Sequence, residues 1–431
     1  MRAARGCDVI VVGAGPAGST AARALALGGA RVLVLDRAAF PRSKPCGGGL
    51  TCRVLKRFPY LPPALDRIGT HVVHQIYMES PGGQSVTIDA PQPLALLVRR
   101  VEFDGLLLDL ARRAGAELQE GVDIRRVSRT DAGVRLEAQD GRSFESPLVV
   151  AADGVYSVVA RRLGFNVGWP REAMALDMME ETPNARMRAT DTDTLWVSFA
   201  HGRGHGYGYV FPKRDHVNVG VGYSVSSYKS DIAEPAYAVH KSFVTAMKRR
   251  GVLCGEPDRA CFTPYQIPIG GPLPVTARGG VFLAGDAGGF VNAFTAEGIY
   301  FAMVSGELAA QAILRGPSER LYQRLWRKEL GSELRDSKWL AWFLYTDLSR
   351  LDRLVRGMRV FPEVTRMLAD YTVGDHTYTG VRRRFLLRFP RLGFKLVTKV
   401  ILKGLRDRLP RPVRHPRESG GPGSGFPLSR E

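Results

Sequence analysis

The stretch Val9-Ile-Val-Val-Gly13-Ala-Gly15-Pro-Ala-Gly18 decides the fold. Four apolar residues of a short buried strand run directly into glycines at GxGxxG spacing, and residues 19–27 have the composition of a helix. Gly13 permits a tight turn, Gly15 lets the backbone approach a pyrophosphate, and Gly18 lets helix and sheet pack closely. The helix N-terminus offers free N–H groups to phosphates. The stretch therefore predicts a Rossmann-type core that binds a dinucleotide.

A second strand supports this prediction. Residues 31–35 are apolar after the first position and end at Asp36, which is followed by Arg37. A carboxylate at the end of this strand is placed to bind an adenosine ribose hydroxyl. Loop, helix and acid together indicate a dinucleotide but do not distinguish NAD from FAD.

Two distant segments resemble motifs of flavin-dependent hydroxylases and reductases. Residues 148–161 contain Asp153-Gly154, which resembles their Asp-Gly motif, and residues 281–287 contain Gly285-Asp286, which resembles their Gly-Asp motif. The resemblance implies FAD, with the aspartate of the second motif bonded to the flavin ribityl chain.

The same resemblance implies further cofactor contacts. After Asp286 the chain continues through Gly298-Ile299 into a helix whose N–H groups would face the flavin pyrimidine edge, where its dipole stabilises the anionic reduced flavin. Arg100 matches the family arginine that contacts the cofactor. The other interpretation of Arg100 is a surface charge at the start of a helix.

Two more segments resemble the geranylgeranyl reductase family. Residues 41–50 match its PxxKxCGG stretch, with Cys46 followed by glycines that allow close approach to a flavin. Residues 205–213 match YxWxFP at Tyr207, Phe211 and Pro212, whereas Tyr209 replaces the tryptophan. The resemblance implies an aromatic-lined tunnel. Alternatively, Cys46 is a small buried residue and the aromatics form an ordinary core stripe.

The resemblance covers about residues 7–320 and implies a reductase that hydrogenates carbon–carbon double bonds of a polyprenyl group. NADPH or a ferredoxin would supply the electrons, and the sequence does not identify the proton donor. An FAD monooxygenase or halogenase is an alternative, although the halogenase stretch WxWxIP is not present. A non-catalytic lipid-binding flavoprotein is a second alternative.

The predicted site follows from these motifs. The residues predicted to bind the cofactor are Gly13, Gly15, Pro16, Ala17, Gly18, Asp36, Arg37, Cys46, Gly47, Gly48, Arg100, Val122, Asp153, Gly154, Gly285, Asp286, Gly298 and Ile299. Those predicted to contact the substrate are Cys46, Tyr207, Tyr209, Phe211 and Pro212. No catalytic residue is assigned. No metal site is expected, since the histidines near residue 205 lack a third ligand.

The fold class expected is α/β, a Rossmann-type FAD-binding domain interleaved with an antiparallel substrate sheet. We assign residues 1–60, 99–164 and 276–318 to the FAD-binding domain, and 61–98 and 165–275 to the substrate domain. Within the latter, residues 213–216 predict a hairpin turn. Residues 319–410 are expected to form a helical region, and 411–431, rich in Pro, Gly and Ser, a disordered tail.

Charge suggests a partner surface. The net charge is +19, and residues 351–431 contain 18 basic against 7 acidic residues. Residues 394–406 have lysines at i, i+4 and i+8 opposite an apolar stripe, so this helix either packs on the FAD domain or docks on an anionic membrane. No nucleic-acid partner is expected, and the oligomeric state stays open. Without a long apolar run or signal peptide, the expected location is cytoplasmic, or peripheral on the membrane.

Overall fold

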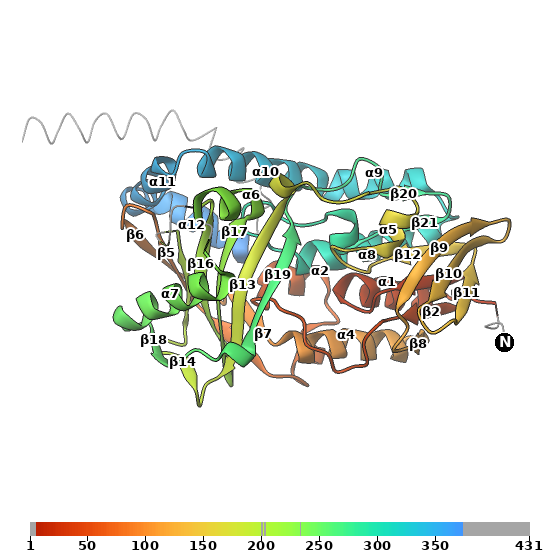
Figure 1. Cartoon of the computed structure of the whole chain (residues 1–431), viewed down its shortest axis with the longest axis horizontal. Helices are drawn as coiled ribbons and strands as arrows, with labels where there is room; N and C mark the ends of the chain where they lie inside the picture. Colours follow the sequence, from red (N-terminus) through yellow and green to blue (C-terminus); the bar gives the residue numbers. More distant parts are fainter. Residues whose placement is uncertain (1–5, 200, 202–203, 233, 374–431) are drawn as a thin grey trace, which may run out of the picture. The chain divides into compact units, whose positions relative to one another are not determined.

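The computed structural model describes residues 6–373 except 200, 202–203 and 233. The predicted basic helix at 394–406 and the predicted tail at 411–431 lie outside these residues. Two large sheets and the helices beside them form the described part (Figure 1).

The first large sheet has six strands and is the predicted Rossmann core. Its strand order is β20 (Ala277–Arg278), β21 (Val281–Leu283), β12 (Leu148–Ala151), β1 (Val9–Val12), β2 (Val32–Leu35) and β8 (Glu117–Gln119). All neighbours are parallel except β20 and β21. β1 and β2 are buried along their whole length, which is typical of parallel strands covered on both faces.

Helix α1 (Pro16–Leu27) follows β1 directly and begins at Pro16, three residues earlier than predicted. Proline is favoured at the first helical position because its missing N–H would have no intrahelical partner there. α1 packs against α8 (Ile299–Leu314) and α4 (Arg100–Arg113). A Cβ at Gly306 of α8 would lie 2.2 Å from the Ala17 carbonyl oxygen. Glycine at this point therefore lets the two helix backbones touch.

The second large sheet has seven strands. Their order is β19 (Phe262–Pro268), β13 (Met174–Pro183), β17 (His216–Ser224), β16 (Gly206–Pro212), β15 (Thr194–Ser198), β5 (Gln75–Glu79) and β6 (Ser85–Asp89). β16 and β17 form the predicted hairpin. The sheet is not wholly antiparallel as expected, because β5 and β15 are parallel. They come from segments far apart in the chain, so no tight turn forces them to run in opposite directions.

Helix α7 (Ala236–Arg249) covers one face of this sheet through Phe243, Val244 and Met247. The opposite face holds the alternate side chains of the same strands, including Tyr207 and Tyr209 of β16. Because successive side chains in a strand point to opposite faces, one face builds a core and the other is available for a site.

Smaller elements complete the described part. The short sheets are β11 (Ser143–Ser146), β10 (Gly133–Ala138) and β9 (Ile124–Thr130); β3 (Gly49–Thr51), β7 (Ala95–Val98) and β4 (Thr70–Val73); and β14 (Met187–Ala189) with β18 (Leu253–Gly255). The short helices are α2 (Cys52–Arg57), α3 (Pro62–Leu65), α5 (Val158–Arg162) and α6 (Val225–Ser227), with single turns η1 (Arg171–Ala173), η2 (Tyr228–Ile232), η3 (Arg259–Cys261) and η4 (Gly285–Gly288).

The predicted C-terminal helical region begins at α9 (Glu319–Glu329) and continues through α10 (Gly331–Tyr345), α11 (Ser349–Val360) and α12 (Pro362–Val373). α9 contacts β20 of the parallel sheet, and α11 and α12 contact β6 of the seven-stranded sheet. In Figure 1, α9, α10 and α11 follow one another along one side, from the parallel sheet to the larger one. These helices therefore connect the two sheets. The predicted domain boundaries stay predictions.

Candidate active site

One large cavity of about 1090 Å³ contains most of the residues singled out in the sequence. Its walls come from the loop between β1 and α1, from the start of α8, and from β13, β15, β16 and β19. Small-molecule sites occupy about 300–1,000 Å³, so this cavity has room for a large ligand or for two ligands together.

The glycine loop forms one end of the cavity. Gly13 has φ +97°, and a Cβ there would lie 2.3 Å from the Ala152 carbonyl oxygen. Gly15 is the N-cap of α1, with no hydrogen bond from a side chain, and it lines the cavity together with Pro16 and Ala17. The first turn of α1 thus offers its backbone to the cavity, an arrangement suited to a phosphate group.

Asp36 connects this loop to β2. It is buried, and its carboxylate accepts hydrogen bonds from the Ala14 N–H at 2.7 Å and from the Ala38 N–H at 2.9 Å. The backbone of the glycine loop is therefore fixed by the same acid that was predicted to bind a ribose. Arg37 and Val122 line the cavity nearby.

Asp153 lies on the wall formed by the loop between β12 and α5. Its Oδ2 accepts hydrogen bonds from Val158 N–H at 2.8 Å and from Val159 N–H at 3.2 Å, so the side chain caps α5. Its Oδ1 is buried and has no hydrogen-bond partner among the described residues. Burial raises the pKa of Asp153, against the effect of these hydrogen bonds. A polar group of a ligand would satisfy the second oxygen.

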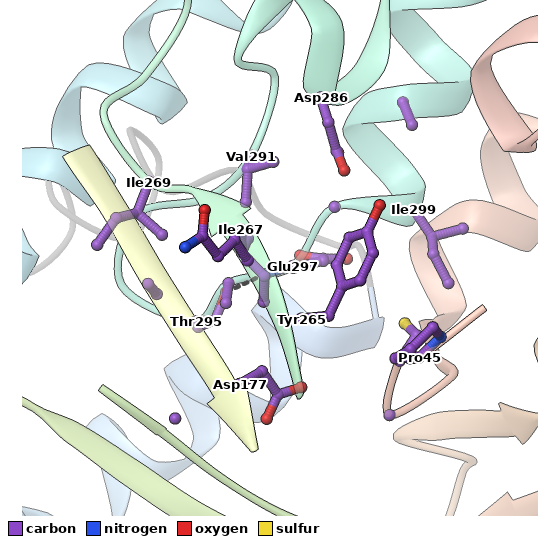
Figure 2. A pocket seen from close by; sticks show the side chains of 18 of the residues that line it. Pro45, Asp177, Tyr265, Ile267, Ile269, Asp286, Val291, Thr295, Glu297 and Ile299 are labelled. Atoms are coloured by element: carbon purple, nitrogen blue, oxygen red, sulfur yellow. Dashed lines mark hydrogen bonds between the residues drawn. The ribbon is translucent and has the colours of Figure 1, made fainter. Parts of the chain in front are cut away.

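Asp286 of η4 lines the cavity and points toward the side of the site that holds Tyr265 (Figure 2). Its Oδ2 lies 3.8 Å from the Lys44 ammonium nitrogen, and its Oδ1 lies 3.7 Å from where a Cβ of Gly298 would stand. Gly298 is the N-cap of α8, and Ile299 is the first residue of that helix. An acid and a helix N-terminus therefore face the same part of the cavity, as the sequence predicts.

The loop before α8 is held in an unusual conformation. Ala296 has φ +55°, which side-chain-bearing residues rarely adopt. Asn292 holds the loop by accepting hydrogen bonds from the N–H groups of Phe294 and Thr295, both at 3.0 Å. Glu297 accepts a hydrogen bond from the Thr51 hydroxyl at 2.8 Å. Strain of this kind persists where surrounding contacts determine the backbone, and it is concentrated at functional sites.

Arg100 is buried rather than a surface charge at a helix start. Its guanidinium donates to both carboxylate oxygens of Asp104, at 2.7 and 2.8 Å, and Arg42 contacts the same carboxylate at 3.1 Å. Burial alone would lower the pKa of Arg100, but Asp104 raises it above its ordinary value. Arg42, which the sequence did not single out, also lies 3.5 Å from where a Cβ of Gly15 would stand.

The Cys46 segment passes close to the aromatic residues of β16. A Cβ at Gly47 would lie 2.8 Å from the Phe211 ring, so only glycine allows this approach. The Cys46 sulfur accepts a hydrogen bond from Gly48 N–H at 3.4 Å. The structure thus brings together the two segments that resemble the geranylgeranyl reductases.

The three aromatic residues of β16 share one face and line the cavity. The ring centroids of Tyr207 and Tyr209 are 6.3 Å apart, and those of Tyr209 and Phe211 are 4.6 Å apart. Tyr207 donates its hydroxyl to the Thr295 carbonyl at 2.6 Å, which connects β16 to the loop before α8. They are therefore cavity walls rather than a stripe of the core between the sheet and α7.

Asp177 of β13 is a site residue that the sequence analysis missed. It is buried, lines the cavity, and accepts a hydrogen bond from the Tyr209 hydroxyl at 3.0 Å. Burial raises its pKa to about 6, against the effects of Tyr209 and His240. Figure 2 shows Asp177 and Asp286 on opposite sides of the Tyr265 ring. Pairing between distant strands creates this site, so no local motif could reveal it.

The far end of the cavity is apolar, and its residues were also missed. They come mostly from β5, β6 and β15, namely Ile76, Met78, Ile88, Leu94, Leu195, Val197 and Phe199. Trp342 and Tyr345 of α10 and Leu368 of α12 contribute from the helical region. A sign of this apolar wall in the sequence was the alternation of polar and apolar residues in the strand that contains Leu195.

Most predicted site residues surround this single cavity. Those that line it are Gly13, Gly15, Pro16, Ala17, Asp36, Arg37, Cys46, Gly47, Gly48, Arg100, Val122, Asp153, Gly154, Tyr207, Tyr209, Phe211, Gly285, Asp286, Gly298 and Ile299. Gly18 and Pro212 are not part of the lining. A Cβ at Gly18 would lie 1.8 Å from the Gly13 carbonyl oxygen, so this glycine serves the packing of the loop. Pro212 is buried at the end of β16.

Among the described residues, no helix is both long and apolar enough to span a bilayer. Nor do those residues contain a group of three or more His, Cys, Asp and Glu side chains placed to hold a metal ion.

Comparison with known proteins identifies the family. A family model for an FAD binding domain matches residues 6–252. Digeranylgeranylglycerophospholipid reductase 1 of Methanothermobacter thermautotrophicus is 33% identical over 376 residues, covering 82% of this chain and 90% of that protein. Menaquinone reductase of Mycobacterium tuberculosis is 32% identical, covering 74% and 78%. Chloroplastic geranylgeranyl diphosphate reductase of Oryza sativa is 32% identical, covering 72% of this chain and 66% of that protein.

Solved structures share the fold. A geranylgeranyl bacteriochlorophyll reductase-like protein of Thermoplasma acidophilum superposes with a TM-score of 0.75 at 21% identity, covering 91% of this chain and 99% of that one. The flavin-dependent brominase Bmp2 gives a TM-score of 0.68 at 18% identity, covering 90% and 100%. Sequence identity thus points to the reductases, while the fold is shared with halogenases. The chain belongs to the geranylgeranyl reductase family of FAD-dependent oxidoreductases.

Proposed function

We propose that this protein uses FAD to hydrogenate carbon–carbon double bonds of a polyprenyl group. The observation that carries this proposal is the continuity of the cavity. Its one end has the backbone and acids suited to a dinucleotide, and its other end is lined by apolar side chains of β5, β6 and β15. Relatives named for the reduction of geranylgeranyl and digeranylgeranyl groups support the same substrate class.

The residues of the cavity fit FAD. The uncapped first turn of α1 suits the pyrophosphate, and Asp36 suits the adenosine ribose. The Oδ1 of Asp153, which has no hydrogen-bond partner among the described residues, and the carboxylate of Asp286 are suited to accept hydrogen bonds from cofactor hydroxyl groups. Under this proposal the N-terminus of α8, at Gly298 and Ile299, faces the flavin ring and favours its negatively charged reduced form.

The bound flavin supplies a hydride equivalent, while the protein supplies placement. An isolated alkene is a poor hydride acceptor, so the double bond must be held close to the reacting edge of the flavin. Phe211, Tyr209 and Tyr207 form a row along the Cys46 segment and are suited to hold a flat alkene there. The apolar end keeps the rest of the prenyl chain out of water.

A separate nicotinamide-binding motif is not part of this proposal. We propose that NADPH or a ferredoxin reduces the flavin before the lipid binds. Supplying each donor in turn to the protein without lipid, and following the bleaching of the oxidised flavin, distinguishes the two.

The test is a half-reaction without oxygen. The purified protein is reduced with dithionite and mixed with geranylgeranyl diphosphate, and flavin reoxidation is followed by absorbance. We expect reoxidation, with a product heavier by two hydrogens per reduced double bond. Reoxidation that requires dioxygen, with oxygen or halide incorporated, would identify a monooxygenase or halogenase instead. A flavin that no donor reduces would identify a non-catalytic lipid binder.

We also propose that the lipid enters from a membrane surface beside α10. Trp339 and Trp342 are 55% and 61% exposed on this helix. Trp342 and Lys338 also line the cavity, and Arg335 is exposed on the same helix. Tryptophan and basic side chains together favour the interface of an anionic bilayer.

Liposomes test this membrane proposal. The protein should sediment with vesicles containing phosphatidylglycerol at low ionic strength, and replacing both tryptophans by serine should weaken that binding. Replacing the exposed Leu27 by serine is the matched control, because Leu27 lies on α1 and does not line the cavity. Equal binding by all three proteins would remove α10 from the interface.

A further inference from the structure

The hydrogen bond between Tyr209 and Asp177 joins two strands that are not neighbours. β17 lies between β13 and β16, and residues Gly220 and Gly222 of β17 have no side chains in the way. A Cβ at Gly220 would lie 2.4 Å from the Tyr209 hydroxyl oxygen. Glycine at this position therefore allows the Tyr209 ring to lie across β17 and reach Asp177.

Asp177 differs from the other acid on the same face of β13. Glu181 is paired with Lys213 and with Arg99, and these cations lower its pKa although burial alone would raise it. Asp177 is 8% exposed, and its Oδ1 has no hydrogen-bond partner among the described residues. A buried carboxyl group that forms no ion pair with a lysine or arginine of the described residues is costly to ionise and is therefore held ready as an acid.

Both members of the pair line the cavity, next to the segment where the alkene is proposed to lie. The Tyr209 ring is 3.6 Å from where a Cβ of Gly47 would stand. We propose, resting on the proposed function, that Tyr209 and Asp177 supply the proton that completes the saturation of the double bond. The sequence left this proton donor unassigned.

The step balances as follows. A bound reduced flavin would supply the hydride equivalent to one alkene carbon and would be oxidised in doing so, while the Tyr209 hydroxyl gives a proton to the other carbon. In this reactive form the hydrogen bond between the two side chains is reversed: the protonated carboxyl group of Asp177 donates across the same 3.0 Å contact, and the Tyr209 hydroxyl proton points to the alkene. As the Tyr209 O–H bond breaks, Asp177 gives its own proton to the Tyr209 oxygen. Asp177 is then ionised and regains a proton from solvent before the next turnover. Because burial raises the pKa of Tyr209 far above its usual value, a free phenolate is disfavoured and both transfers are coupled.

The pair predicts a pH dependence. The titratable groups around Asp177 are Tyr209 of β16, Tyr265 beside it on β19, and His240 of α7 across the sheet, while Lys44 lies over the Tyr265 ring at 4.8 Å. With the pKa of Asp177 raised to about 6, the reactive protonated form decreases above that pH. The rate of flavin reoxidation by the alkene should therefore fall as pH rises through about 6.

The experiment compares Asp177→Asn and Tyr209→Phe with wild type, using geranylgeranyl diphosphate and dithionite-reduced protein. Each variant should bind FAD and accept electrons from dithionite normally. Reoxidation by the alkene should slow by about 10²–10⁴-fold, the usual contribution of a positioned acid. The fall above pH 6 should disappear in Asp177→Asn. Asp177→Glu, which keeps a carboxyl group, should recover part of the rate.

Tyr322→Phe is the matched control. Tyr322 is also buried, and its hydroxyl donates to the Leu283 carbonyl at 2.6 Å, but it does not line the cavity. Its variant should keep the wild-type rate and pH profile. If wild type reduces the alkene while Asp177→Asn and Tyr209→Phe match its rate and profile, the pair is not the proton source and the proposed function stands. If wild type reduces no prenyl alkene, both proposals fail.

Discussion

At the scale of single residues, Gly13 shows how one backbone angle determines a binding site. Its φ of +97° belongs to the region that favours glycine, and its missing side chain lets the loop lie against the backbone of Ala152. Gly29 has a similar φ of +85° but open space around it. The two glycines thus separate the effect of backbone strain from the effect of a steric clash.

We expect Gly13→Ala to abolish FAD retention and to lower stability by more than the 1–2 kcal/mol of left-handed strain. Gly29→Ala, the control, should lose about that strain energy only and should purify with its flavin. Flavin absorbance per protein and urea unfolding measure the two effects. Equal flavin occupancy in both variants would show that the close approach at Gly13 is not required.

Asp177 makes stability depend on pH in a direction opposite to most acids. Its folded-state pKa of about 6 exceeds the unfolded value of about 3.9, so the folded protein binds this proton more tightly. The favourable contribution is complete below about pH 4 and is lost as pH rises through about 6, with a limit on the order of 3 kcal/mol.

Asparagine cannot ionise, so Asp177→Asn should escape this loss. The stability of the variant relative to wild type should rise between about pH 4 and about pH 8, toward the limit on the order of 3 kcal/mol. Urea unfolding at several pH values measures the difference. A constant difference over this range would mean that Asp177 is ionised at no unusual cost in the folded protein.

At the scale of elements, Arg53 joins helix α2 to the loop before α8 and to helix α10. It extends from α2 to Glu297, just before α8, at 3.1 Å, and to Glu333 of α10 at 2.5 Å. All three side chains are nearly buried. Breaking a buried network by removing one partner leaves uncompensated charges in a low-dielectric interior.

We therefore expect Arg53→Met to lower the free energy of unfolding by about 3–5 kcal/mol. The control is Arg31→Met. Arg31 forms an ion pair with Asp8 at 2.7 Å, but both side chains are exposed to water, so a far smaller loss of stability is expected than for Arg53. Denaturant unfolding of both variants measures the contrast, and equal losses would contradict the assignment of Arg53 to a buried network.

The sequence predicted those elements that rest on local patterns. GxGxxG between a strand and a helix needs only neighbours in the chain, so β1 and α1 were predicted to within a few residues. The parallel pairing of β5 and β15 was not, because strand direction between remote segments leaves no mark in local polarity. Asp177 and the apolar wall were missed for the same reason. Their role depends on which strands become neighbours.

At the scale of the whole described molecule, the space at the apolar end of the cavity should set the length of prenyl chain that can be reduced efficiently. Val197 lines the apolar end from β15 and is only half-buried, so a larger side chain there would extend into the free space. We expect Val197→Phe to lower kcat/KM for geranylgeranyl diphosphate relative to geranyl diphosphate by about 10-fold or more.

Val72→Phe is the control for this prediction, because Val72 on β4 is 37% exposed and does not line the cavity. Its ratio of kcat/KM values should match that of wild type. A Val197→Phe variant that handles both chain lengths as wild type does would place the prenyl chain elsewhere.

The single continuous cavity also affects what fraction of the electrons reaches the lipid rather than dioxygen. Under the proposed function, flavin and prenyl chain share one space, so a bound lipid would shield the reduced flavin from dioxygen. An empty cavity would leave the reduced flavin open to reaction with oxygen, whereas a filled cavity would direct each electron pair to the alkene. Substrate binding would in this way limit the formation of hydrogen peroxide. The same apolar walls that select the prenyl chain would have this second effect.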